Sequence, residues 1–284
     1  MTQLIKKIVL LMLLLVFFTG LTGCSNDKMK DANQSMNLTD DWKAIQQKGT
    51  VVIGIDDSFV PMTFRQKDGK LVGYDVDLAK KVFEKYGIKV DFQTIDWSMK
   101  ETELKNGTID LIWNGYTKTT ARAKTVAFSR TYLTNKQVVV TKKSSEINSF
   151  SEMKNKILGV QSGSAGFDSL NLYPNILKNK IQDEEPIQYD SFDNAFIDLN
   201  ADRIQGLLID DVYANYFIEH QTNSNSYRVI DGKFKTEDFA VGLRKSDVTM
   251  KLKINKAITE LQNEGYLKKL NHKWFGEDTT VRNN

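Results

Sequence analysis

Short apolar runs that alternate with amphipathic segments constrain the fold of this chain more than any other feature. Residues 51–55 contain no polar side chain, which is typical of a strand buried on both faces of a parallel sheet. From Tyr74 to Tyr86 the apolar residues recur at helical spacing, and Gly87 follows as a C-terminal cap. The sequence therefore predicts an α/β fold built on mostly parallel sheets.

The same order of elements continues along the chain. Predicted strands cover residues 90–92, 109–113, 138–141, 157–161, 187–189, 207–209 and 239–243. Predicted helices cover residues 99–106, 192–199 and 212–218, one helix that begins near Phe167, and two helices in the tail at 252–261 and 267–274. Asp68-Gly69 and Asp231-Gly232 mark turns. We expect two α/β series, with a crossing after residue 138 and a return near residue 239.

The stretch from residue 110 to 128 contains a local conflict. A strand ends at Asn114-Gly115, and Thr119-Thr120 predicts a helix start, because Thr is a good N-cap. Arg122 then falls in the first helical turn, where the helix dipole disfavours a cation. A residue that breaks a local rule is often functional, and a guanidinium beside free N–H groups can bind a small carboxylate. The alternative is an ordinary surface salt bridge, and this stretch alone leaves both open.

The N-terminus has the features of an exported lipoprotein. Lys6-Lys7 precede an apolar run over residues 8–18, which predicts a secretory signal over residues 1–23. A short membrane anchor is the alternative, although the run is shorter than the roughly 20 residues that span a bilayer. The tetrapeptide Leu-Thr-Gly-Cys resembles a bacterial lipobox, which implies that Cys24 carries the lipid, palmitate included. Residues 24–41 are mostly polar and predict a flexible tether.

Composition and charge argue against nucleic acid, a metal or a cofactor as the partner of this chain. Removal of residues 1–23 takes away Lys6 and Lys7 and no acid, so the net charge falls from +3 to +1. A nearly neutral chain does not suit nucleic acid as a partner. His220 and His272 lack ligand-spaced neighbours, so we expect no metal, and no motif indicates a cofactor.

Three segments, in this order, resemble one known family. They are Leu-Val-Gly-Tyr-Asp-Val-Asp-Leu-Ala at residues 71–79, Asn-Gly-Tyr-Thr-Lys-Thr-Thr-Ala-Arg at residues 114–122, and Gly-Val-Gln-Ser-Gly-Ser-Ala at residues 159–165. Over residues 42–275 the chain resembles the polar-amino-acid family of extracellular solute-binding proteins that serve ABC importers. The resemblance implies a two-lobed, type II periplasmic-binding-protein-like fold. Each lobe is a mostly parallel sheet flanked by helices, and two hinge strands join the lobes.

The resemblance also implies the division of the chain. Residues 42–139 and 237–284 would form the first lobe, and residues 140–236 the second. Ligands of such sheets bind at the carboxyl ends of the strands, where the two lobes face each other.

The family's binding residues can be carried over one by one. Arg122 aligns with the arginine that clamps the ligand α-carboxylate, with further contacts from Gly115, Thr117, Ser164 and the N–H of Ala165. Asn114 stands where the family has a serine. Asp210 aligns with the aspartate that pairs with the α-ammonium, whereas Asp211 reads as a salt bridge or helix cap. A phosphate loop at residues 162–166 is disfavoured, because no Lys-Ser/Thr pair follows it.

Four residues are expected around the ligand side chain. Phe59 and Trp97 align with aromatic residues that sandwich the ligand, and their alternative is core packing. Asp56 aligns with an acid at the polar end of the side chain, and Gln161 is a second polar candidate. Hydrogen bonds that stabilise loops are the alternative for both.

The resulting expectation is a monomeric, lipid-anchored receptor on the extracellular face of the membrane. It would bind glutamine, cystine or a basic amino acid and deliver it to an ABC permease. The alternative is a cyclohexadienyl dehydratase-like enzyme, for which no acid/base pair stands out beside the proposed pocket. A sensor module has no support, because no signalling domain is present in the sequence.

Overall fold

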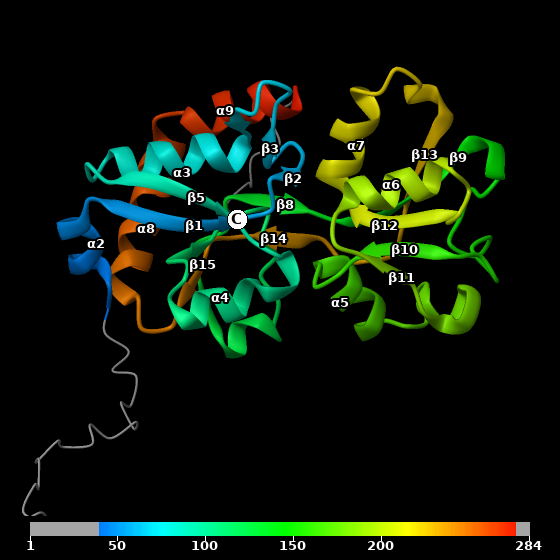
Figure 1. Ribbon diagram of the computed structural model, residues 1–284, viewed down its shortest axis with the longest axis horizontal. Coiled ribbons are helices and arrows are strands. Elements are labelled where there is room, and N and C mark those ends of the chain that lie inside the picture. Colours follow the sequence, from blue (N-terminus) through cyan, green and yellow to red (C-terminus); the bar gives the residue numbers. More distant parts are fainter. Residues whose placement is uncertain (1–39, 277–284) are drawn as a thin grey trace, which may run out of the picture. The chain divides into compact units, whose positions relative to one another are not determined.

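The structure, a computed structural model, describes residues 40–276, so the expectations for the signal, Cys24 and most of the tether lie outside the described residues. Two five-stranded sheets organise the described part of the chain (Figure 1). We call each sheet, together with the helices packed on it, a lobe.

The first lobe contains the sheet β5-β1-β6-β15-β7. Its strands are β1 (Thr50–Ile55), β5 (Lys89–Thr94), β6 (Leu111–Ile112), β7 (Val126–Phe128) and β15 (Gly242–Arg244). Its helices are α2 (Trp42–Lys48), α3 (Tyr74–Glu84), α4 (Lys100–Asn106), α8 (Val248–Asn263) and α9 (Tyr266–Phe275), with the short turns η1 (Trp97–Met99) and η2 (Arg122–Lys124). A small antiparallel sheet of β2 (Ser58–Phe59), β3 (Thr63–Arg65) and β4 (Leu71–Val72) follows β1.

The second lobe contains the sheet β11-β10-β12-β9-β13. Its strands are β9 (Gln137–Lys142), β10 (Leu158–Gln161), β11 (Ile187–Tyr189), β12 (Gly206–Asp210) and β13 (Tyr227–Asp231). Its helices are α5 (Ala165–Leu172), α6 (Phe192–Asn200) and α7 (Asp211–Glu219), with the turns η3 (Lys143–Ser145), η4 (Lys178–Lys180), η5 (Gln182–Glu184) and η6 (Ser224–Ser226).

Two antiparallel strands connect the lobes. They are β8 (Leu133–Asn135) and β14 (Glu237–Phe239), with Asn135 opposite Glu237. The chain thus crosses once on leaving the first lobe and once on returning to it. By strand pairing the first crossing is β8, because all of β9 lies in the second sheet.

The two sheets share one pattern of strand directions. In the first, β1 runs parallel to β5 and β6, while β15 is antiparallel to β6 and β7. In the second, β10 runs parallel to β11 and β12, while β9 is antiparallel to β12 and β13. The antiparallel strand of each sheet is the one that follows a crossing. The expected two-lobed fold with mostly parallel sheets is confirmed.

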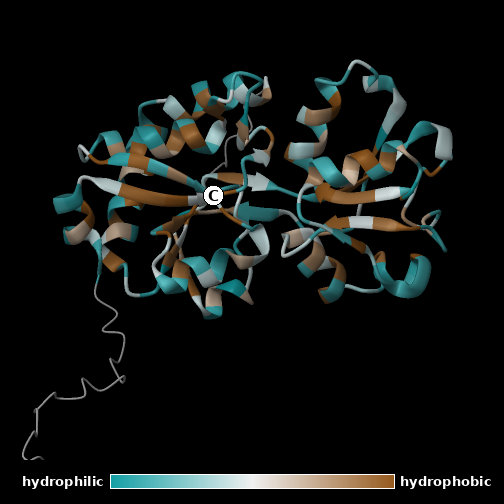
Figure 2. Cartoon of the chain, viewed as in Figure 1, coloured by the Kyte–Doolittle hydropathy of each residue, from teal (hydrophilic) through white to brown (hydrophobic). Residues whose placement is uncertain are grey.

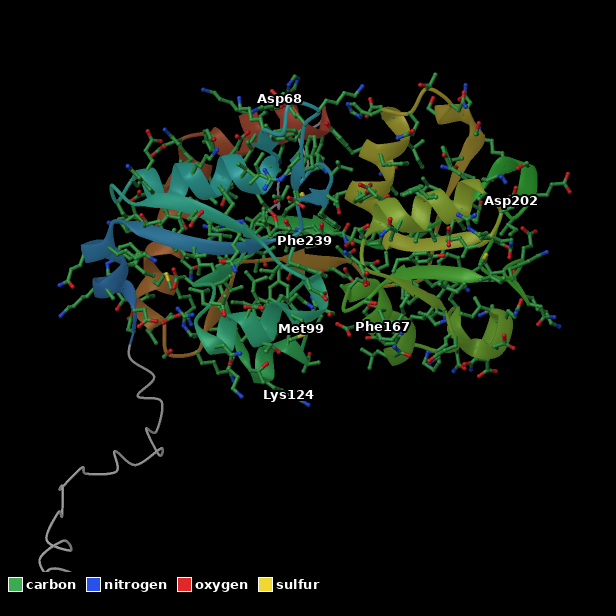
Figure 3. The ribbon with its side chains drawn as sticks, in the orientation of Figure 1. Asp68, Met99, Lys124, Phe167, Asp202 and Phe239 are labelled. Atoms are coloured by element: carbon green, nitrogen blue, oxygen red, sulfur yellow. The ribbon has the colours of Figure 1, made fainter. Side chains whose placement is uncertain are left out.

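Buried apolar side chains on the strands hold each sheet to its helices, and Figure 2 shows the apolar strands within polar loops and outer helix faces. Val51, Ile53 and Ile55 on β1 are fully buried. Side chains fill the space between the elements, and Phe239, labelled in Figure 3 at the end of β14, is also fully buried. Burial of one such side chain contributes about 1.5–3 kcal/mol, so the core stabilises the crossing as well as the lobes.

Two local expectations were wrong. No α-helix begins at Thr119; the chain forms only the 3₁₀ turn η2, with the Arg122 N–H donating to Thr119 Oγ1 at 3.1 Å. The strand expected over residues 239–243 is two strands, because Ala240 and Val241 lie between β14 and β15 as the chain leaves one sheet and enters another.

Candidate functional site

All eleven residues expected to contact a ligand line one narrow cavity between the lobes, with a volume of about 10 Å³ open to the centres of water-sized molecules. The first lobe contributes Asp56, Phe59, Trp97, Asn114, Gly115, Thr117 and Arg122. The second lobe contributes Gln161, Ser164, Ala165 and Asp210. These residues follow the carboxyl ends of β1, β5, β6, β10 and β12, where parallel strands bring their loops together.

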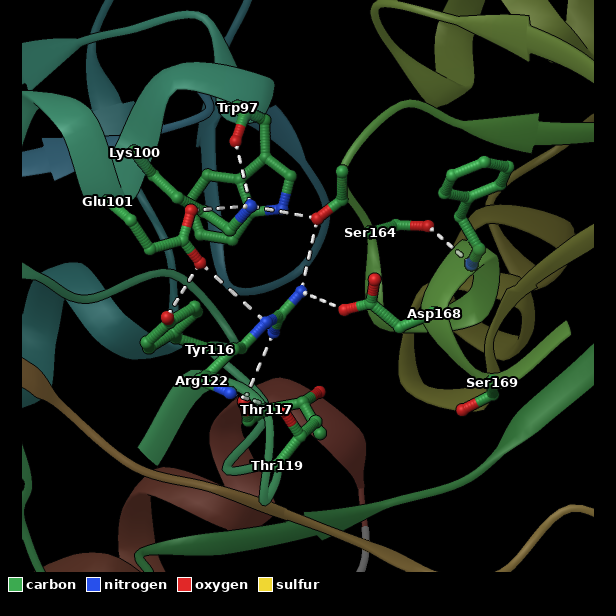
Figure 4. Close-up of polar contacts among 12 residues, drawn as sticks. Trp97, Lys100, Glu101, Tyr116, Thr117, Thr119, Arg122, Ser164, Asp168 and Ser169 are labelled. Atoms are coloured by element: carbon green, nitrogen blue, oxygen red, sulfur yellow. Dashed lines mark hydrogen bonds and ion pairs between the residues drawn. The ribbon is translucent and has the colours of Figure 1, made fainter. Parts of the chain in front are cut away.

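The Arg122 side chain is 7% exposed and contacts both lobes. Its Nη1 donates to the Thr117 carbonyl at 3.1 Å, and its Nη2 donates to the Gly163 carbonyl at 3.1 Å (Figure 4). The guanidinium also lies over the Tyr116 ring, 4.8 Å from its centroid. These contacts fix the orientation of the guanidinium plane at the cavity wall.

Two carboxylates balance the charge of Arg122. Asp168 of α5 lies 3.1 Å from Nη2, and Glu101 of α4 lies 3.7 Å from Nε. Glu101 also accepts a hydrogen bond from the Tyr116 hydroxyl at 2.8 Å. The ordinary salt bridge and the ligand clamp are therefore not exclusive: Arg122 makes ion pairs at the cavity rim and also lines the cavity.

Lys100 adds a second buried cation, which the sequence analysis did not single out. It is 2% exposed, and its Nζ donates to the Gly163 carbonyl of the second lobe at 2.8 Å and to the Trp97 carbonyl at 3.0 Å. Burial, with a further contribution from Arg122, lowers the pKa of Lys100 to about 8. One carbonyl of the second lobe thus accepts hydrogen bonds from two cations of the first.

Asp210 ends β12 and is 5% exposed. Its Oδ1 accepts hydrogen bonds from Asn135 Nδ2 at 2.5 Å and from Gln137 Nε2 at 2.9 Å. Burial first, and then the negative charge of Glu237, raise the pKa of Asp210 to about 8. Arg122 and Asp210 thus place a cation and an acid on two walls of one cavity, one from each lobe.

Asp211 differs from its neighbour, as expected. It is the first residue of α7, and its Oδ1 accepts a hydrogen bond from Asn215 Nδ2 at 2.9 Å in the same helix. It does not line the cavity that holds Asp210. His220 stacks on Tyr216, and no cluster of metal-ligating side chains occurs within residues 40–276.

Asp56 joins the lobes at another wall of the cavity. Its Oδ1 accepts hydrogen bonds from the N–H and the hydroxyl of Ser58, and its Oδ2 accepts one from Gln161 Nε2 at 2.7 Å. The loop-stabilising role and the cavity position therefore coexist. Asp193 of α6 lies near enough for the charge of Asp56, after burial, to raise its pKa. Asp193 does not line the cavity, so Asp56 is the acid of this wall.

Both candidate aromatic residues line the cavity and pack as core residues at the same time. Phe59 contacts the rings of Phe192 and Tyr213 in the second lobe, with centroids 5.9 Å and 5.5 Å away. Trp97 packs edge-on against Tyr116 at 6.1 Å. Contacts with neighbouring aromatic rings therefore hold Phe59 and Trp97 in position at the cavity wall.

The loop after β6 is held by a residue that the sequence analysis quoted without a role. The Gly115 N–H donates to Asp75 Oδ2 at 2.6 Å, so it is not free for the expected contact with a ligand. Gly115 instead permits close approach: its φ is +55°, and a Cβ atom there would lie 2.9 Å from the Phe59 ring. The Thr117 hydroxyl donates to Glu237 at 3.3 Å.

Ser164 is the N-cap of α5, and its Oγ accepts a hydrogen bond from the Phe167 N–H at 3.1 Å. The hydroxyl proton remains able to donate into the cavity. Ala165 is the first residue of that helix, where backbone N–H groups have no partner within the helix. The N-terminus of α5 thus adds partial positive charge to the wall that holds Arg122.

Comparison with known proteins identifies the family of this chain. The family described as "Bacterial extracellular solute-binding proteins, family 3" matches residues 51–277. The chain belongs to this family.

Among solved structures, this family 3 protein is similar to an ABC uptake transporter substrate-binding protein from Streptococcus pneumoniae with bound histidine. The identity is 51%, the TM-score is 0.84, and the match covers 86% of this chain and 99% of the other. It is also 30% identical to the arginine-binding extracellular protein ArtP of Bacillus subtilis, over 80% of this chain and 87% of the relative. The L-cystine-binding protein TcyJ of Escherichia coli is 28% identical over 83% of this chain and 86% of its own length.

These relatives confirm the expected family and favour a binding protein over the dehydratase-like enzyme. The family name also supports a position outside the cytoplasmic membrane. Within the described residues, no helix is long and apolar enough to cross a bilayer.

Proposed function

We propose that this chain binds a single polar L-α-amino acid in the cavity between its lobes and delivers it to an ABC importer. The observation that carries the proposal is the position of Arg122 and Asp210, which line one cavity from opposite lobes. Arg122 would clamp the α-carboxylate, and Asp210 would accept the α-ammonium. Neither lobe neutralises a zwitterion alone, so the ligand stabilises the closed arrangement.

The proposed ligand has a side chain that donates hydrogen bonds, with histidine and arginine first. Asp56 is the acid at the remaining cavity wall, its charge reaches Asp193 of α6, and burial of an unpaired anion there would be costly. Phe59 and Trp97 offer apolar faces to a flat or extended side chain. The 51% identical relative with bound histidine and the relative named for arginine agree with this choice. Glutamine and cystine are weaker candidates, because the glutamine side chain is neutral and the distal ammonium of cystine brings a carboxylate with it.

Calorimetry of the purified protein tests the proposal. We expect L-histidine or L-arginine to bind, and Arg122→Ala to weaken that binding at least about 30-fold, because truncation of a buried charged contact typically costs about 2–5 kcal/mol. Arg65→Ala is the matched control, since Arg65 is half exposed and pairs only with Asp57 among the acidic residues of the described part. Wild-type affinity in Arg122→Ala would refute the assignment.

The proposal includes a lipid anchor at Cys24 and a monomeric receptor on the extracellular face of the membrane. The lipobox-like segment and the single cysteine support the anchor. We expect wild-type protein in the membrane fraction of its native cells and Cys24→Ala in the soluble or secreted fraction. Retention of Cys24→Ala in the membrane fraction, after cleavage of residues 1–23, would contradict lipid anchoring.

A further inference from the structure

Asp210 has a second carboxylate beside it, Glu237 on the crossing strand β14. The two acids share their donors: Asn135 Nδ2 lies 2.5 Å from Asp210 and 3.4 Å from Glu237, and Gln137 Nε2 lies 2.9 Å and 3.0 Å from them. Neither acid forms an ion pair with Lys or Arg in the part of the chain that the structure describes. Asp210 is buried and Glu237 is partly buried, and two such adjacent carboxylates without a cation are costly to ionise together.

Glu237 also collects hydrogen bonds from both lobes. The Thr117 hydroxyl of the first lobe lies 3.3 Å from Oε2, and the Ser169 hydroxyl of α5 lies 3.2 Å from Oε1. Burial raises the pKa of Glu237, and the donors from Gln137, Ser169 and Asn135 only partly oppose that rise. The pair is therefore held in place by four side chains but is not neutralised by them.

The surrounding charges do not offset the cost of ionising both Asp210 and Glu237. The charge of Arg122 lowers the pKa of both acids, but its effect on each is smaller than that of burial. Arg122 itself is paired with Asp168 and Glu101. On the next element, Asp211 interacts with Lys136 rather than with the pair. Asn114 Oδ1, buried at the cavity wall without a hydrogen-bond partner, adds an unfilled acceptor for an N–H donor.

We propose that Asp210 and Glu237 share one proton before a ligand binds, and that the α-ammonium of the ligand expels this proton to the solvent. The ammonium then faces two carboxylates, not the single aspartate expected from the family resemblance. No covalent bond to the ligand forms or breaks, and the proton released is balanced by the positive charge that enters. This inference rests on the proposed function, since it assigns a second residue and a proton-linked step to the same cavity.

The proton count of binding tests the inference. Calorimetry with L-arginine at pH 6.5, in phosphate and in Tris, measures the protons released from the difference in buffer ionisation heat. L-arginine has no group that titrates between pH 6 and 8, whereas the same experiment with L-histidine requires subtraction of its imidazole. We expect release of close to one proton by the wild type, and an affinity that rises up to tenfold per pH unit between pH 6 and 7.

Glu237→Gln separates the proton-linked pair from a merely structural role. The amide keeps the shape and the Thr117 and Ser169 contacts but removes the second acid. Burial still acts on Asp210 in this variant, but the charge of Glu237 does not, so we expect the proton release to fall clearly below that of the wild type and the pH dependence of affinity to weaken. Asp238→Asn is the matched control, because it removes the same charge from the adjacent, exposed position of β14 and should leave the proton count unchanged.

Two outcomes would overturn the inference: binding by the wild type without proton release, or equal release by the wild type and Glu237→Gln. Absence of binding by either amino acid would count against the proposed function instead. The ligand-free protein gives an independent reading. Its melting temperature should fall from pH 5.5 to 8.5 as the shared proton is lost, and Glu237→Gln should show a smaller fall. Parallel curves for the two proteins would refute the shared proton.

Discussion

Asp75 is a buried side chain that holds a cavity-lining loop in place, although Asp75 does not line the cavity itself. It is 1% exposed, and its Oδ2 accepts hydrogen bonds from the Gly115 N–H at 2.6 Å and from the Tyr132 hydroxyl at 3.0 Å. Burial raises its pKa to about 7 against these hydrogen bonds. The acid thus ties the start of α3 to the loop after β6 and to the residue before β8.

The raised pKa of Asp75 predicts a pH-dependent stability. Its folded-state pKa exceeds the unfolded value of 3.8, so the folded protein holds the proton more tightly. The stabilisation from this proton is complete below about pH 4 and is lost as the pH rises through 7, by up to about 4 kcal/mol. We expect Asp75→Asn to reduce this loss in urea unfolding measured at pH 5 and pH 8. An unchanged difference between the two pH values would contradict the assignment.

Among elements, the loop between β10 and α5 brings the second lobe closest to the first. Gly163 has φ +66°, and its carbonyl accepts the hydrogen bonds of Lys100 and Arg122. A Cβ atom at this position would lie 2.9 Å from the Ser98 Cα atom of the first lobe. Glycine is therefore needed both for the backbone conformation and for contact between the lobes.

Gly163→Ala should reduce the free energy of ligand binding more than it reduces the free energy of unfolding. The new methyl group meets backbone of the opposite lobe, so the closed arrangement becomes costly, whereas the positive φ alone costs about 1 kcal/mol. We expect an affinity loss of at least tenfold by calorimetry. Gly69→Ala is the control, since Gly69 also has a positive φ, +83°, but has open space around it. Similar effects of the two substitutions on affinity would argue against a steric role in closure.

At the scale of the whole molecule, the protein's own side chains hold the lobes together. Lys100 and Arg122 contact Gly163, Arg122 contacts Asp168, and Asp56 contacts Gln161. Each contact joins the two lobes, and the crossing strands β8 and β14 belong to neither five-stranded sheet. Closure therefore depends on charges that are independent of the ligand as well as on the ligand itself.

Lys100→Met is expected to open the ligand-free protein in solution. The substitution keeps most of the side-chain volume but removes the donor to Gly163. We expect a larger radius of gyration by small-angle X-ray scattering, restored by saturating ligand, and an affinity about tenfold weaker. Lys105→Met on the same helix is the control, because Lys105 is exposed. An unchanged radius in ligand-free Lys100→Met would show that this contact does not govern closure.

Sequence patterns predicted the sheets well because buried parallel strands are continuously apolar and their helices are amphipathic. The strand at residues 51–55 and the helix from Tyr74 appear where expected. The helix expected at Thr119 failed because a capping residue alone does not supply the apolar face that stabilises a helix. The eleven residues that the family resemblance selected line one cavity, and their contacts with a ligand are still a prediction.

The residues that the sequence did not reveal are those whose roles depend on the opposite lobe. Lys100 resembles any helical lysine until its partner, the Gly163 carbonyl, is known. Glu237 sits in a polar segment before an apolar strand, and its neighbour Asp210 is distant in sequence. Asp75 was visible within the segment at residues 71–79, where an acid beside a buried tyrosine is a signal for an internal hydrogen bond.

The connection by β8 and β14 leaves every strand of the second sheet within one uninterrupted stretch, from Gln137 to Asp231. Genetic recombination at two points, one in the codons of each crossing strand, could therefore replace that whole half of the cavity with the counterpart from a paralogue. Such a chimera would inherit the guanidinium side of the pocket unchanged and acquire new Gln161, Ser164 and Asp210 equivalents together. Exchange of the segment that encodes the second sheet is thus a route to a changed ligand selectivity, in addition to point mutation.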